Sequence, residues 1–216
     1  MKEFQGWWFP DYETHFPKML QKSVDKGLPP VYQEPARKRG IELCKNRRVA
    51  LDIGANVGLW SRDLCQAFDQ VIAFEPVSDF RECLIKNVIA ENLVVKTVAL
   101  GNETTRAVMN ITEGNTGHSH IDPASFGTGD TEVVTLDSLD LSVVDYMKID
   151  CEGFEYRVIQ GGEQTIKTHR PIVVLEQKPH DAYADQYGQH AAVDLLKSWG
   201  MVRLDQVKDD WIMGWM

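Results

Sequence analysis

The sequence predicts an α/β protein with a doubly wound, mostly parallel seven-stranded sheet, helices on both faces and a C-terminal antiparallel hairpin. The main observation is an alternation, from Arg48 onward, of short apolar runs with amphipathic stretches. The runs are rich in β-branched residues and too short for helices, which is typical of strands buried on both faces. Strands that alternate with helices need right-handed crossovers, which place helices on both faces of a parallel sheet. We therefore assign residues 41–216 to one α/β domain.

The first half of this domain contains three strands joined by two helices. The strands are predicted at 48–54, 70–76 and 93–101, and the amphipathic helices at 57–68 and 78–92. Ser78 or Asp79 suits the N-cap of the second helix, because a short polar side chain accepts a hydrogen bond from a free N–H group there.

The second half contains four more strands, two helices and a terminal hairpin. A loop rich in Gly, Ser, Asn and His separates the first two of these strands. Adjacent Gly161 and Gly162 weaken the first helix, and Gly200 suits the C-cap of the second. The strands are predicted at 106–112, 131–139, 144–153 and 170–177, the helices at 155–169 and 190–200, and the hairpin at 201–216.

Residues 1–40 do not follow the alternation. They are rich in aromatic residues and prolines, with room for one helix, and we expect an N-terminal extension that packs on the α/β domain or caps its site. Adjacent Trp7 and Trp8 cannot both face inward on a strand. Two interpretations remain open for this pair: they fill a groove on the domain, or they contact an apolar or ring-bearing substrate.

Composition excludes several classes of protein. The net charge of −9 argues against a duplex nucleic-acid partner, which needs a basic face. No apolar run is long enough to cross a membrane, and the first residues lack the apolar core of a secretion signal, so a cytoplasmic protein is expected. The four cysteines fall at neither zinc-site nor redox-motif spacing and are expected to be free thiols.

The segment LDIGANVG, residues 51–58, marks a ligand site after the first strand. Ligands of doubly wound sheets bind at the carboxyl ends of the strands, where the strand order reverses. A dinucleotide fold needs the glycine pattern GxGxxG, but Asn56 and Leu59 occupy its second and third glycine positions. The ligand is therefore expected to lack a pyrophosphate. The backbone contacts predicted for it are at Gly54, Ala55, Asn56 and Gly58.

Two carboxylates at strand ends indicate the chemistry of this ligand. Asp52 suits a positively charged amine, and Glu75, followed by Pro76 at the end of the second strand, suits both hydroxyls of a ribose. A cationic amino acid joined to a nucleoside without phosphate describes S-adenosyl-L-methionine. The structural alternative is that Asp52 caps a helix and Glu75 merely begins a loop. The adenine is expected beside Leu100 and Gly101, which follow the third strand.

Six segments in order resemble the FkbM-family methyltransferases: LDIGANVG, VIAFEP, VALGN, VVTLDSL, MKIDCEGFE and PIVVLEQ. The resemblance covers about residues 48–180, and KIDCEGFE is its most specific segment. It implies a Rossmann-like class I methyltransferase fold, S-adenosyl-L-methionine as the cofactor and a hydroxyl oxygen as the usual methyl acceptor.

The catalytic group must accept the proton that an attacking alcohol loses during methyl transfer. Asp150 is the first candidate, for the base or for the methionine part of the cofactor, because it ends a strand beside the crevice. The other candidates for the base are Glu176 and His118, followed by His120 and His180. Asp150 and Glu176 could share a magnesium ion, but no third carboxylate is evident at a fixed spacing, and no metal ligand is predicted.

The sequence thus predicts a methyltransferase that acts on a small molecule or a glycan. The alternatives are a nicotinamide-dependent oxidoreductase on a similar sheet and a non-catalytic nucleoside-binding module. The missing glycine pattern argues against the first, and the presence of Asp52, Glu75 and Asp150 together argues against the second. The identity of the acceptor and the oligomeric state do not follow from the sequence.

Overall fold

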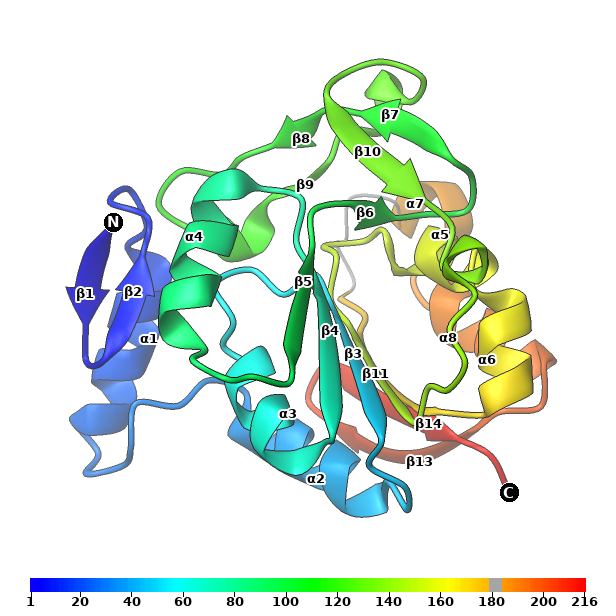
Figure 1. Cartoon of the computed structure of the whole chain (residues 1–216), viewed down its shortest axis with the longest axis horizontal. Helices are drawn as coiled ribbons and strands as arrows, with labels where there is room; N and C mark the ends of the chain where they lie inside the picture. The colour runs from blue at the N-terminus through cyan, green and yellow to red at the C-terminus, as the bar shows by residue number, and fades with distance from the viewer. Residues whose placement is uncertain (179–183) are drawn as a thin grey trace.

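The computed structural model describes residues 1–178 and 184–216 and contains the predicted seven-stranded sheet (Figure 1). Its order is β13-β14-β12-β11-β3-β4-β5. Five strands are parallel, and the other two form the C-terminal antiparallel hairpin. The parallel strands are β3 (Val49–Ile53), β4 (Gln70–Phe74), β5 (Leu93–Lys96), β11 (Tyr146–Ile149) and β12 (Ile172–Glu176); the hairpin is β13 (Val202–Val207) and β14 (Asp210–Gly214). The predicted fold class is confirmed.

Helices cover both faces of the sheet because successive strand residues point to opposite sides. Leu51 and Ile53 of β3 face one apolar core, formed with α5 (Glu155–Gln160), α6 (Glu163–His169) and α8 (Ala191–Ser198). Ala50 faces the opposite core, which contains side chains of α2 (Glu34–Leu43) and α3 (Ser61–Ala67). On the same side, α4 (Ser78–Asn87) packs through Leu84 on Ala73. A short helix, α7 (Ala184–Tyr187), precedes α8.

The single strand predicted at 93–101 is wrong. β5 ends at Lys96, and β6 (Ala99–Leu100) joins a second, three-stranded sheet with β10 (Thr131–Val134) and β7 (Thr105–Ala107). The pairing of Ala99 with Val133 takes the chain out of the main sheet. The predicted strands at 106–112 and 131–139 are likewise shorter. The first is divided between β7 and β8 (Met109–Asn110), which pairs with β9 (His120–Ile121), and the second ends in a 3₁₀ turn, η3 (Asp137–Leu139).

The helix predicted at 155–169 is interrupted at Gly161 and Gly162, and the reason is close packing. A Cβ at Gly161 would lie 1.9 Å from the carbonyl oxygen of Gly101, and one at Gly162 would lie 2.8 Å from Leu136. Only glycine permits this approach, and α5 ends and α6 begins at this pair of glycines. Two further 3₁₀ turns, η1 (Thr116–His118) and η2 (Pro123–Ser125), lie in the loop between β8 and β10.

The N-terminal extension packs on the α/β domain (Figure 1). It forms a hairpin, β1 (Lys2–Phe4) with β2 (Trp7–Phe9), followed by α1 (His15–Val24). Trp7 and Phe9 are buried against Val57 and Leu59, whereas Trp8 points the other way, and its ring contacts the Lys86 ammonium. Both tryptophans therefore pack on the domain. The domain boundary at residue 40 stays a prediction, because α2 spans it.

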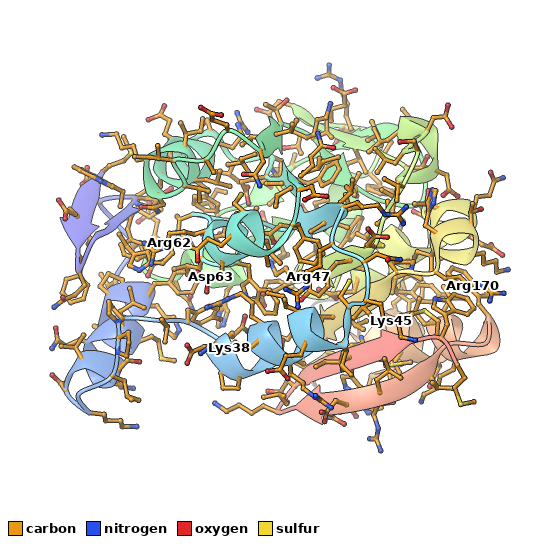
Figure 2. The ribbon with its side chains drawn as sticks, turned by 60° about the horizontal axis from the view of Figure 1, so that its bottom comes forward. Lys38, Lys45, Arg47, Arg62, Asp63 and Arg170 are labelled. Atoms are coloured by element: carbon orange, nitrogen blue, oxygen red, sulfur yellow. The ribbon has the colours of Figure 1, made fainter. Side chains whose placement is uncertain are left out.

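The amino ends of the strands lie on the face opposite the site. Figure 2 shows Lys38, Lys45 and Arg47 on this face, on α2 and the loop that leads into β3. Within residues 1–178 and 184–216, no helix is both long and apolar enough to cross a bilayer. All four cysteines, which lie within these ranges, are free thiols, as predicted.

Candidate functional site

A cavity lies at the carboxyl ends of β3, β4 and β11, where the strand order reverses. The strand ends and the segments that follow them, the N-terminal segment, and the region around β8 and β9 form most of its wall, and α4 and β6 contribute the rest. The described residues that line it are Phe16, Tyr32, Ile53, Gly54, Ala55, Asn56, Leu59, Trp60, Phe74, Glu75, Pro76, Phe80, Ala99, Leu100, Met109, Thr116, Gly117, Ser119, His120, Ile121, Lys148, Asp150, Cys151, Glu152 and Phe154.

The turn after β3 brings two strand ends together. Gly54 has a φ of +74°, and a Cβ there would lie 1.9 Å from the carbonyl oxygen of Asp150. Its N–H and that of Ala55 donate to Phe74. Asn56 also has a positive φ, and its side-chain amide donates to the carbonyl of Thr116. Gly54, Ala55 and Asn56 line the cavity, where sequence analysis expects cofactor contacts.

Gly58 and Gly101 are not among the described residues that line the cavity, and a cofactor contact at either glycine stays a prediction. A Cβ at Gly58 would lie 2.9 Å from Val88 on the α4 side, and one at Gly101 would lie 2.7 Å from Val133. Each glycine therefore permits close packing beneath the site. Leu100, by contrast, lines the cavity as predicted.

Glu75 lies at the end of β4 and is 4% exposed. One of its carboxylate oxygens faces the turn after β3, and the other faces the loop after β4. The backbone N–H groups of Asn56 and Val77 each donate to it at 2.8 Å. Burial raises the pKa of Glu75 to about 7, although these two hydrogen bonds oppose the shift. The carboxylate is thus held at the cavity wall, and Pro76 lies beside it.

Asp52 is not among the described residues that line the cavity. It is fully buried, the Ser61 hydroxyl donates to it at 2.5 Å, and the Lys148 ammonium lies 3.4 Å away. The expected direct contact between Asp52 and a ligand amine is therefore corrected, because the position of that amine is filled by a cation of the chain itself.

Lys148 lines the cavity, although the sequence suggests no role for it. It points from β11 to the same side as Asp52, and its ammonium donates to the carbonyl of Gly54 at 2.7 Å. Burial alone lowers the pKa of Lys148, but Asp52 and Asp150 outweigh it and raise that pKa. A lysine inside the apolar run YMKI was the available signal, since a buried charge needs a partner.

Asp150 and Glu152 form the acidic wall of the cavity, and Glu176 lies behind them. One carboxylate oxygen from each residue falls within 4.8 Å of the others. Lys178 pairs with Glu176 at 2.5 Å and with Glu152 at 3.2 Å. Burial and Asp150 raise the pKa of Glu176, and Lys178 opposes this shift.

These three carboxylates are the candidate metal ligands of the described residues. From the sequence no third carboxylate is evident at a fixed spacing, but the structure places Glu152, which has a backbone φ of +52°, beside the other two. A divalent cation would compete with Lys178 for Glu152 and Glu176 oxygens. Glu155 has a structural role in the same turn: its carboxylate accepts from the N–H of Cys151 at 2.7 Å.

Only one of the three predicted catalytic residues, Asp150, belongs to the described cavity lining. Glu176 lies behind the wall, paired with Lys178. The His118 ring lies near that of His15, with ring centroids 6.5 Å apart, and burial, Lys178 and His15 lower the pKa of His118. Its neighbour His120 lines the cavity instead. His180 lies outside the described residues.

The N-terminal extension and the loop between β8 and β9 form a joined cap over the cavity. Glu13 is fully buried, and its carboxylate accepts from the N–H groups of Phe16 at 3.0 Å and Thr116 at 2.6 Å. Gln33 connects the same extension to the wall, because it accepts from the Trp60 indole at 2.7 Å. These contacts place Phe16 and Tyr32 of the extension in the cavity lining.

The chain is similar to one family of proteins. A family model described as "Methyltransferase FkbM domain" matches residues 52–202. The solved FkbM methyltransferase from Methylobacillus flagellatus KT is 16% identical, with a TM-score of 0.51; the match covers 79% of this chain and 44% of that one, so this chain spans less than half of its length.

Two further solved structures share the fold. The O-methyltransferase TomG from Streptomyces achromogenes, in complex with SAM, is 14% identical with a TM-score of 0.54, and the match covers 93% of this chain and 88% of that one. The O-methyltransferase from Bacillus cereus, in complex with SAH, is 15% identical with a TM-score of 0.54, covering 92% and 89%. No curated protein matches the sequence.

Proposed function

The chain belongs to the FkbM methyltransferase family, and on this premise we propose that it transfers a methyl group from S-adenosyl-L-methionine to a hydroxyl oxygen of a small molecule or glycan. One observation carries the proposal: a single cavity joins Glu75, at the end of β4, to Asp150, after β11. Ligands of such a sheet bind at the carboxyl ends of its strands. We assign the nucleoside of the cofactor to the Glu75 end of the cavity, and its methionine part, with the reacting methyl group, to the Asp150 end.

The residues of the cavity fit this cofactor. The two backbone N–H groups fix the Glu75 carboxylate, and each oxygen keeps a lone pair for a ribose hydroxyl. Leu100 and Phe154 supply apolar surface for a flat base. In the turn after β3, the Asn56 side chain, which donates to the carbonyl of Thr116, takes the place of the glycine that admits a pyrophosphate in dinucleotide folds. This geometry also weighs against a nicotinamide cofactor.

Asp150 is the proposed base of the reaction. When bound, the cofactor supplies an electrophilic methyl group on a sulfonium, which is a good leaving group. The chain must then align an acceptor hydroxyl, exclude water and accept one proton. Asp150 is the predicted catalytic carboxylate that lines the cavity, and the cap formed by Phe16, Tyr32 and Gly117 covers it. The ion pair of Glu176 and Lys178 lies behind Asp150 and would help to hold the part of the cavity wall where the acceptor binds.

Calorimetric titration tests the cofactor, and methyl incorporation tests the acceptor. We expect micromolar binding of S-adenosyl-L-methionine and no comparable binding of NAD. Tight binding of NAD with no response to the methyl donor would overturn the proposal. Transfer of a labelled methyl group to components of a cell extract, followed by analysis of the labelled linkage, distinguishes an ether from a methylated amine.

A further inference from the structure

We propose that Lys148 and Asp150 form a subsite for the two charges of an α-amino acid, with Lys148 binding the carboxylate and Asp150 the ammonium. The inference rests on the proposed function and deepens it, because S-adenosyl-L-methionine carries such a group at one end. Lys148 belongs to none of the contacts that the sequence predicts.

The Lys148 ammonium has donor capacity directed at the cavity. An ammonium has three N–H donors. In this structure the Lys148 ammonium donates to the backbone carbonyls of Gly54 at 2.7 Å and Ile53 at 3.4 Å. The carboxylates of Asp52 and Asp150 lie 3.4 Å and 3.8 Å from it, so only one of its contacts is short. The residue is only 5% exposed, yet it lines the cavity. A carboxylate that enters from the cavity would receive a short, charge-assisted hydrogen bond in an environment of reduced screening.

The arrangement of charges assigns the opposite end of the ligand to Asp150. Asp52 is closed to a ligand ammonium, because Ser61 and Lys148 already contact it below the cavity. Asp150 is the cavity-wall carboxylate beside Lys148, 3.8 Å from it, whereas Glu152 pairs with Lys178. Two opposite charges at this separation match an ammonium and a carboxylate that share one carbon atom.

A purely structural role for Lys148 makes a different prediction. In that case its ammonium only neutralises Asp52 and Asp150 and connects β11 to the turn after β3. Ligand affinity would then not depend on a ligand carboxylate. Removal of that carboxylate would even strengthen binding, because the ligand becomes more positive and the wall contains Asp150 and Glu152. The two roles therefore predict opposite signs for one measurement.

The experiment compares three ligands by calorimetry: S-adenosyl-L-methionine, its decarboxylated form, and 5′-methylthioadenosine, which lacks the amino-acid part. We expect the decarboxylated form to bind the wild-type protein at least about tenfold more weakly than the parent, the size expected for a lost hydrogen bond between charged groups. Equal or tighter binding of the decarboxylated form overturns the inference while leaving the proposed function intact. Failure of both the parent and 5′-methylthioadenosine to bind overturns the proposed function itself.

Variants assign the effect to one residue. Lys148→Met should reduce the affinity for the parent so that the ratio between the two ligands falls to about one, with 5′-methylthioadenosine binding retained. Lys178→Met removes the other cation of the same acidic wall and should keep the wild-type ratio. A Lys148→Met protein that keeps the full ratio refutes the assignment. If that variant does not fold, the wild-type comparison still decides between the two signs.

Discussion

The substitution Glu75→Gln tests the nucleoside half of the site while it keeps the volume of the side chain. The two Glu75 oxygens face the N–H groups of Asn56 and Val77, so the amide NH₂ of glutamine would face a donor in either orientation. The proposed bonds from the carboxylate to the ribose hydroxyls are weakened at the same time. A hydrogen bond to a charged group contributes about 1.5–3 kcal/mol, so the dissociation constant should rise about ten- to a hundredfold.

The pH dependence of cofactor affinity tests the same interaction between Glu75 and the ribose. Burial raises the pKa of Glu75 to about 7, and the proposed ribose contacts need the ionised carboxylate. In the wild-type protein, affinity should therefore fall about tenfold per pH unit below this pKa and level off above it. Titration calorimetry between about pH 5 and about pH 8 measures this slope. Glu75→Gln should remove it, whereas Glu82→Gln, the same change at an exposed position on α4, should keep it.

The free energy of unfolding of the cofactor-free protein should change with pH in the opposite direction to the affinity. The folded-state pKa of Glu75, about 7, lies above its ordinary value of 4.5. The group therefore contributes stability below about pH 4.5 that is lost as the pH rises through about 7, by up to about 3 kcal/mol. Urea denaturation at a series of pH values checks this. A wild-type affinity that is independent of pH and equal to that of Glu75→Gln would refute the role of Glu75.

Three further substitutions test other parts of the site. Asp150→Asn should lower kcat about a hundredfold or more, and it should also weaken cofactor binding by about tenfold, because the same carboxylate is proposed to accept a hydrogen bond from the cofactor's ammonium. Steady-state kinetics and calorimetry measure the two effects separately, and wild-type turnover would remove Asp150 as the base. Gly54→Ala should prevent folding or cofactor binding, since its Cβ would lie 1.9 Å from the Asp150 carbonyl oxygen, and a normal thermal transition with full binding would contradict the close approach. Glu13→Ala should lower the free energy of unfolding by about 2–4 kcal/mol, measured in urea, because the N–H groups of Phe16 and Thr116 lose their acceptor; an unchanged value would show that the cap does not depend on Glu13.

The local pattern of the sequence predicted the main sheet because each parallel strand is a short apolar run between two turn signals. It failed at 93–101, where one apolar run supplies both β5 and β6. The division depends on the pairing of Ala99 with Val133, a partner far along the chain, and no local period encodes such a pairing. The break at Gly161 has a similar cause, since the Gly101 backbone that excludes a Cβ there comes from another element.

For the candidate site, the sequence predicted which strand ends form it, but not how each side chain lies there. Glu75 and Asp150 line the cavity because strands that are parallel end at the same edge of the sheet. Asp52 was assigned to a ligand because its position at a strand end does not show which groups of the chain already contact its carboxylate, here Ser61 and Lys148. His118 and His120 are two residues apart in one loop, and only the folded loop shows which of them lines the cavity.

The sequence by itself determined the parallel strands of the main sheet, the family and the edge of the sheet at which a ligand is expected to bind. These properties follow from hydrophobic periodicity and from turn residues, which act over a few neighbouring positions. Only the tertiary structure decided that Lys148 fills the place beside Asp52 and that Glu13 joins the N-terminal extension to the loop over the cavity. The physical reason is that a buried charge is stable only with a partner, and that partner comes from whichever distant segment the fold places within hydrogen-bond distance.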